Sequence, residues 1–220
     1  MNKHHHSALT ASRPVRPFCT ASSHKKASGF SLVEILISII VLSFGLLGMV
    51  GLQAAALQAN RESRIQSSAV RLARELGELM RSNKKIGTAT TVATNPYLID
   101  YDYASSATVT AAPTNCFTGD CYSEPDTAAA QLDLAKFEVQ DWLTRVTTDL
   151  PGAKVKVCFD ATPFDASGTP QWTCSDSGGV AVIKIGWTKA STNKSKTGAA
   201  AFEKATVPSV ILPVTAGSTT

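Results

Sequence analysis

One apolar stretch, residues 35–52, restricts this chain more than any other feature. None of its side chains is charged, and a single acid, Glu34, stands directly before it. An α-helix rises about 1.5 Å per residue, so about 18 residues come close to crossing a bilayer. Lys25 and Lys26 precede the stretch. Positive charge on that side predicts one membrane crossing with a cytoplasmic N-terminus.

The residues around Glu34 form a motif. Gly29 and Phe30 precede the acid, which is the fifth residue counted from Phe30. This arrangement resembles the processing site of type IV prepilins, in which the chain is cut between a glycine and a phenylalanine. The resemblance implies cleavage between Gly29 and Phe30 by the prepilin peptidase, N-methylation of Phe30, and an assembly contact made by Glu34.

A second similarity lies far from this motif. The segment that contains Asp133, Trp142, Pro151 and Gly152 resembles the second helix of PilV-type minor pilins. Residues 46–54 resemble the same group. The implied protein is a structural component, not an enzyme, without metal or cofactor. It would prime or modify type IV pilus assembly, supporting twitching motility, adhesion or DNA uptake. Its partners would be other pilins, major and minor, contacted through the N-terminal helix.

The resemblance also implies a location, the inner membrane before assembly and the pilus or cell surface afterwards. A pseudopilin of a type II secretion system shares this organisation and remains an alternative. An alternative of another class is a secreted binding domain with an ordinary signal peptide. Ala54, Ala55 and Ala56 offer small residues for a cut before Leu57, but that cut leaves Glu34 without a role.

The net charge belongs to the first residues of the chain. The whole chain carries +4, whereas residues 1–29 hold five basic side chains and no acid, so residues 30–220 carry −1. That balance gives no argument for nucleic-acid binding. A DNA-receptor pilin would need a local basic patch. The candidates are Lys184, Lys189, Lys194, Lys196 and Lys204.

The positions of the histidines and cysteines limit which catalytic, metal and disulfide sites the chain can form. All four histidines lie before residue 25, which excludes a histidine base or histidine-ligated metal from residues 30–220. Four cysteines remain after Cys19, an even set that favours two disulfides in an oxidising compartment. Each of the two favoured pairs closes a short loop. The alternative interpretation is a zinc site made by all four cysteines, which lack the tight spacing usual in such sites. The pairs are Cys116–Cys121 and Cys158–Cys174.

Four segments are expected: a prepilin leader (1–29), a membrane-spanning half-helix (30–56), an amphipathic half-helix (57–86) and an extracytoplasmic globular domain (87–220). One helix is predicted over residues 30–80, ending at Asn83 or Gly87. Its second half shows apolar residues at spacings of three and four, typical of a face packed on a domain. These are Ile65, Ala69, Leu72, Leu76 and Leu79.

A second helix is predicted over residues 127–148, with Asp126 as N-cap and a stop at residues 150–152. Its apolar stripe comprises Leu132, Ala135, Val139, Trp142 and Val146.

Alternating residues predict strands at 155–159 and 181–187, joined by a long disulfide-bridged connection, with a short strand near 97–103. Residues 207–214 suit only a sheet edge because of Pro208 and Pro213. The predicted fold is therefore pilin-like α+β, a long N-terminal helix packed on a small antiparallel sheet with a second helix. No catalytic set stands out. Asp100 and Asp102, or Asp160 and Asp165, could form a paired-carboxylate or calcium site, but their spacing matches no metal loop and they are interpreted as exposed turn acids. Trp142, Trp172 and Trp187 are interpreted as filling the core or covering the disulfide rather than forming a ligand platform.

Overall fold

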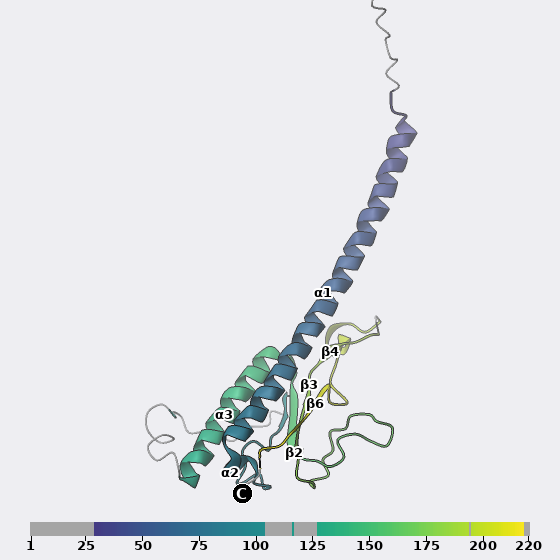
Figure 1. Ribbon diagram of the computed structural model, residues 1–220. Coiled ribbons are helices and arrows are strands. Elements are labelled where there is room, and N and C mark those ends of the chain that lie inside the picture. The colour runs from purple at the N-terminus through teal and green to yellow at the C-terminus, as the bar shows by residue number, and fades with distance from the viewer. Residues whose placement is uncertain (1–28, 104–115, 117–126, 194, 218–220) are drawn as a thin grey trace, which may run out of the picture. The chain divides into compact units, whose positions relative to one another are not determined.

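The computed structural model describes residues 29–103, 116, 127–193 and 195–217. The predicted α+β class is confirmed, with a long N-terminal helix, a second helix and a small antiparallel sheet (Figure 1). The chain divides into two compact units, Met1–Gly51 and Leu52–Thr220. The elements are α1 (Leu32–Ser82), α2 (Lys84–Gly87), β1 (Asp100–Asp102), α3 (Ala128–Asp149), β2 (Lys154–Phe159), β3 (Ala181–Gly186), β4 (Lys189–Ala190), the 3-10 helix η2 (Gly198–Ala201), β5 (Phe202–Glu203) and β6 (Val210–Val214).

Helix α1 runs without interruption for 51 residues. No proline occurs between Phe30 and Asn95, so no residue in this range lacks the backbone donor that a helix needs. The predicted helix over residues 30–80 is confirmed, with each end displaced by two residues.

From Leu52 onward α1 belongs to the second unit, and there one face is buried. The predicted stripe is confirmed, because Ala69, Leu72 and Leu76 are fully buried while Ile65 and Leu79 pack partly buried against the same core. The helix period of 3.6 residues brings these positions onto one side.

Asn83 ends α1 by leaving the helical conformation, with φ −113° and ψ 63°. Its side-chain amide donates to the Gln131 carbonyl at 2.9 Å, which ties this corner to α3. The chain then makes the single turn α2, which ends at Gly87. Asn83 and Gly87 are both predicted as possible ends of the first helix. Asn83 ends α1, and Gly87 ends α2.

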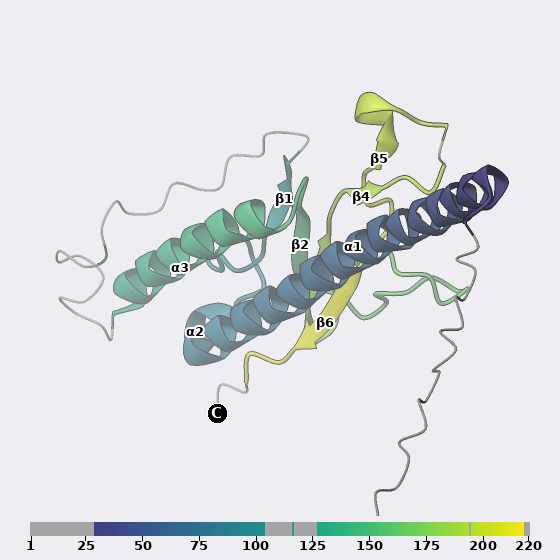
Figure 2. The ribbon, with the colours of Figure 1, turned by 90° about the horizontal axis from the view of Figure 1, so that it is seen from above.

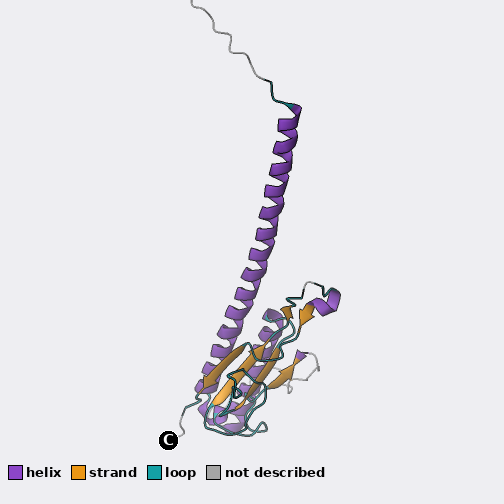
Figure 3. Cartoon of the chain, turned by 90° about the vertical axis from the view of Figure 1, so that its right-hand side faces the viewer, coloured by secondary structure: helices purple, strands orange, loops and turns teal. Residues whose placement is uncertain are grey.

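Four strands form one antiparallel sheet in the order β1-β2-β3-β6. Figure 3 shows the strands in orange beside the helices of the same domain. Val155 faces Ile185 across β2 and β3, and Ile183 faces Leu212 across β3 and β6. The edge position predicted for residues 207–214 is confirmed by β6, where Pro213 cannot donate a backbone hydrogen bond. Strands β4 and β5 form a separate two-stranded ribbon.

Helix α3 follows its predicted course, but its N-cap is Thr127 and not Asp126. The Thr127 hydroxyl accepts a hydrogen bond from the Ala130 N–H at 3.2 Å, which satisfies one of the free donors of the first turn. Asp126 itself lies outside the described residues. At the other end Leu150 caps the helix and Gly152 adopts φ +58°, a conformation that favours glycine.

Within the second unit, α3 and the C-terminal part of α1 run side by side on one face of the sheet (Figure 2). Trp142 of α3 is fully buried, and its indole N–H donates to the Leu72 carbonyl of α1 at 2.9 Å. Trp187 is also buried and donates to the Glu62 carboxylate at 3.2 Å. The sequence-based interpretation of these two tryptophans as core is confirmed.

Candidate assembly site

The prepilin-like motif lies at the start of α1, with its predicted cut outside the helix. Gly29, Phe30 and Ser31 are not helical, and the Phe30 side chain is 79% exposed. The first turn is closed by the Ser31 carbonyl, which accepts from the Glu34 N–H at 3.0 Å and from the Ile35 N–H at 3.3 Å. The Gly29–Phe30 peptide bond is therefore not held in helical hydrogen bonding.

Glu34 occupies the first helical turn and is exposed. A negative charge there suits the positive end of the helix dipole. Its carboxylate makes no ion pair or side-chain hydrogen bond with any residue that the structure describes. Its backbone carbonyl accepts a hydrogen bond from the Ser38 hydroxyl at 2.7 Å. The carboxylate is thus available to a group from another molecule.

Helix α1, which contains Glu34 in its first turn, is long and apolar enough to cross a membrane, and none of its most apolar segment is buried. The polar side chains within it are satisfied locally, because Ser38 and Ser43 donate to the carbonyls of residues four positions earlier, each at 2.7 Å. Such bonds remove the cost of placing a hydroxyl in hydrocarbon. This segment needs a lipid or protein environment to cover it.

The cysteines lie in the second unit. Cys158 at the end of β2 and Cys174 are joined by a disulfide, the pair predicted from loop length, with 6.4 Å between their Cα atoms. Both sulfur atoms are therefore committed, which argues against the four-cysteine zinc site. Cys116 is buried and disulfide-bonded, but its predicted partner, Cys121, lies outside the described residues.

Asp160 is not the exposed turn acid that the sequence suggested. Its carboxylate lies 2.6 Å from the Lys184 ammonium, and neither side chain has solvent-accessible surface. Burial alone would raise the pKa of the Asp160 carboxyl. Hydrogen bonds from Lys184 and from the N–H groups of Thr162 and Ser175 outweigh that effect and hold the pKa below its usual range.

The same ion pair corrects the proposed basic patch. Lys184 is buried in β3 and donates to the Thr173 carbonyl at 2.7 Å, so it cannot belong to a surface. Lys196 contacts Glu203 at 2.9 Å, and Lys189 lies 3.6 Å from Glu62. Lys194 lies outside the described side chains, and Lys204 is exposed. Within the described residues, the burial of Lys184 and the ion pairs of Lys189 and Lys196 therefore argue against the basic patch considered from the sequence.

The prediction of turn acids is wrong for Asp100 and Asp102, which lie in strand β1 and form ion pairs with lysines of the neighbouring strand β2. Asp100 contacts Lys156 at 2.8 Å, and Asp102 lies 3.4 Å from Lys154. Asp165 is exposed, as expected, and accepts from Ser167 and from the Thr169 N–H, which lowers the pKa of its carboxyl.

Trp172 is only half-buried. The Lys154 ammonium lies 5.0 Å from its ring centre, and its indole N–H donates to the Ala205 carbonyl. Trp172 therefore covers the sheet at the surface and does not lie in the central core.

Sequence reasoning missed one partly buried acid between α3 and the segment before β1. The Tyr97 hydroxyl donates to Glu138 at 2.5 Å in a partly buried position. Burial raises the pKa of the Glu138 carboxyl, an effect that the bond from Tyr97 partly offsets. Burial, together with Glu138, raises the pKa of Tyr97 as well. No local pattern marks this pair, since 41 residues separate its members.

One comparison with known proteins identifies part of the chain. Residues 24–50 match the family model described as the prokaryotic N-terminal methylation motif. No curated protein and no solved structure is significantly similar to the chain. The motif implies processing by a prepilin peptidase, membrane anchoring and assembly with other pilins. It suggests a structural role rather than an enzymatic one. Together with the α+β fold, it supports assignment of this chain to the type IV pilin-like proteins, a class that includes pilins and pseudopilins.

Proposed function

We propose that this chain is a PilV-type minor pilin, a structural subunit that primes or modifies the assembly of a type IV pilus. The observation that carries the proposal is the start of α1. A non-helical Gly29–Phe30 pair stands before an exposed Glu34, and a long uncovered apolar helix follows. Twitching motility, adhesion or DNA uptake would be the processes that such a pilus serves.

Cleavage would create the second charge that this site needs. Hydrolysis of the Gly29–Phe30 bond frees the α-amino group of Phe30, which the peptidase then methylates. An acid in a membrane helix costs about 2.5–3.5 kcal/mol at the centre of the bilayer, and less near the interface. In a staggered bundle, Glu34 of one subunit meets the Phe30 amine of its neighbour. Each charge then compensates the other only in the assembled state, which sets the stagger as well as the affinity.

The proposal assigns a role to each segment of the chain. Residues 1–29 form the leader that is removed, and residues 30–56 form the part of α1 that spans the inner membrane. Residues 57–86 form the amphipathic part, and residues 87–220 the globular domain outside that membrane. The cytoplasmic N-terminus follows from the basic residues before the apolar run.

The choice of a pilus over a secretion pseudopilus rests on the globular domain. It is large, and a disulfide joins Cys158 to Cys174. We assign a second disulfide to Cys116 and Cys121. Crosslinks of this kind suit a filament exposed outside the cell, because disulfides persist in oxidising surroundings.

The test is the N-terminal residue and its mass in protein recovered from membranes and from sheared pili. A chain that begins with methylated Phe30 and co-purifies with pili is the expected result. A methylated chain that is absent from pili but present in a secretion apparatus indicates a pseudopilin. A chain that begins at Leu57 identifies a secreted domain and contradicts the proposal.

A further inference from the structure

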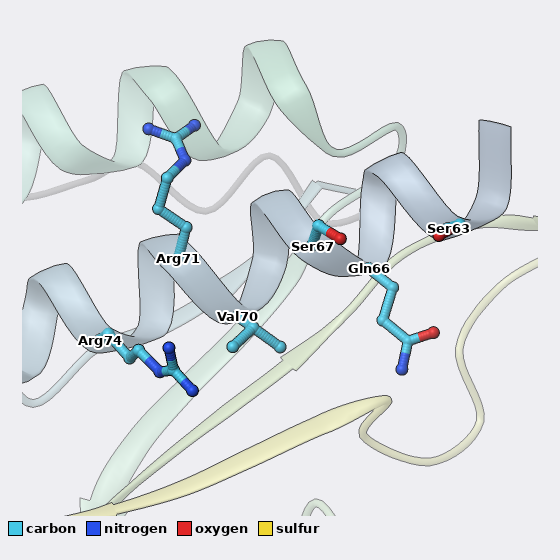
Figure 4. A pocket seen from close by; sticks show the side chains of 6 residues that line it. All are labelled: Ser63, Gln66, Ser67, Val70, Arg71 and Arg74. Atoms are coloured by element: carbon cyan, nitrogen blue, oxygen red, sulfur yellow. The ribbon is translucent and has the colours of Figure 1, made fainter. Parts of the chain in front are cut away.

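The outward face of α1 carries a shallow groove (Figure 4). Its walls are two rows of side chains, each row made of residues four positions apart. Such rows are the ridges of a helix surface, and the space between two of them accepts a ridge from another helix. The rows are Ser63, Ser67 and Arg71, and Gln66, Val70 and Arg74.

The two ends of the groove differ in size and charge. Ser63 and Ser67 are short, so another backbone can approach closely at that end. Arg71 and Arg74 are long and positively charged at the other end. The groove extends over twelve residues, from Ser63 to Arg74, or about 16 Å at a helical rise of about 1.5 Å per residue. That length accommodates about three turns of a second helix.

The charge at this face is not balanced within the described chain. Arg74 is exposed and makes no ion pair with any residue that the structure describes. Arg71 contacts Asp149 at 3.1 Å, yet its side chain remains 64% exposed. A guanidinium retains its charge and binds carboxylates with two parallel hydrogen bonds, so this face favours acidic side chains.

The acids on the same part of α1 already have cations as neighbours. Each contacts a basic residue of its own chain, and none is left to neutralise the groove. The pairs are Glu62 with Lys189, Glu75 with Arg145, and Glu78 with Arg81.

We infer that this groove receives a helix from a different pilin subunit, one that presents carboxylates to Arg71 and Arg74. The inference rests on the proposed function, because it takes the neighbour to be another pilin. Parallel, in-register packing of the same face of a second copy would bring arginine against arginine, which is unfavourable. The groove therefore favours a neighbour that presents carboxylates over a second copy packed in that way.

Anionic lipid is the competing occupant, and the position of Arg74 disfavours it. Leu57 is the last large apolar residue of the exposed run in α1, and Arg74 lies 17 residues beyond it. That separation is about 25 Å along a helix, whereas a headgroup layer is only about 5–8 Å thick. Arg74 is thus separated from the exposed apolar run, along the helix, by more than the thickness of a headgroup layer, which favours a protein partner.

The test places a photoreactive amino acid at Ser67 of the full chain in cells that make pili, and identifies the crosslinked peptide by mass spectrometry. The expected product joins Ser67 to a helix of another pilin that contains Asp or Glu. Arg74→Glu should lower the yield more than about tenfold because it opposes like charges, whereas Arg74→Lys should retain most of it. Lys204→Glu, at an exposed lysine outside the groove, is the matched control and should leave the yield unchanged.

Replacing the acid of the crosslinked partner by arginine should restore the yield with Arg74→Glu. A product with phospholipid, a product with a second copy, or a yield unaffected by Arg74→Glu overturns the inference. So does the absence of any product from Ser67 when the protein is present in pili. The N-terminal mass is read from the same sample. Methylated Phe30 in pili without the crosslink refutes the groove alone, whereas unprocessed protein refutes the proposed function as well.

Discussion

Lys184 and Asp160 form an ion pair at 2.6 Å with both side chains fully withdrawn from solvent. The pair lies beside the Cys158–Cys174 disulfide, since Lys184 also binds the carbonyl of Thr173. It holds the long β2–β3 connection against the face of β3 opposite the helices. Charges buried in this way are costly unless each keeps its partner.

Removing one partner should therefore destabilise the fold strongly. Lys184→Met leaves Asp160 buried without its cation, and the expected loss is about 3–5 kcal/mol in the free energy of unfolding. The double variant Lys184→Met with Asp160→Asn should be more stable than Lys184→Met alone, because no uncompensated charge remains. Urea unfolding of the detergent-solubilised protein, followed by tryptophan fluorescence, measures both. Equal stability of the two variants would contradict a coupled pair.

The same pair predicts a dependence of stability on pH. Because the folded-state pKa of Asp160 is lowered, its contribution is present above the unfolded pKa of about 4 and is lost as the pH falls through the folded value. Asp160→Asn should remove part of this loss below about pH 4. Glu138 acts in the opposite sense, since burial raises its pKa and its ionisation costs stability as the pH rises. Glu138→Gln should therefore leave the acid loss intact, which makes it the control.

Glu34→Ala and Glu34→Gln should leave membrane insertion intact and abolish incorporation into pili. Either change removes the carboxylate that would meet the Phe30 amine of a neighbour, while Gln keeps the shape of the side chain. Fractionation measures insertion, and immunoblotting of sheared pili measures incorporation. Glu34→Asp, which keeps the charge, should be less impaired. Normal amounts of the Ala or Gln variant in pili would refute the assembly contact.

The disulfide prediction concerns stability and gel mobility together. Cys158→Ser combined with Cys174→Ser opens a loop with a sequence separation of 16 residues, and loop entropy predicts a loss of about 3 kcal/mol. Reducing agent should slow migration of the mature protein on a denaturing gel. Peptide mapping without reduction should also recover Cys116 linked to Cys121. Four free thiols, or unchanged mobility, would be inconsistent with two disulfides.

Local sequence patterns were sufficient for the features that depend on near neighbours along the chain. The spacing of Ala69, Leu72 and Leu76 shows the buried face of α1, because helical geometry alone brings residues three and four apart together. The uncharged run after Glu34 likewise predicts a membrane-length helix from composition and length. Pro213 predicts an edge strand because it lacks a backbone donor. These properties hold whatever the chain packs against.

Tertiary structure alone decided which polar groups meet. Lys184 stands in an apolar strand and Asp160 in a turn-rich loop, and local patterns assign both to the surface. Only the fold of the β2–β3 connection over the sheet buries them together. Glu62 with Trp187, and Glu75 with Arg145, depend in the same way on the register between distant elements. Burial and pairing are relations between segments far apart in sequence, so they become definite only when packing fixes the distances between them.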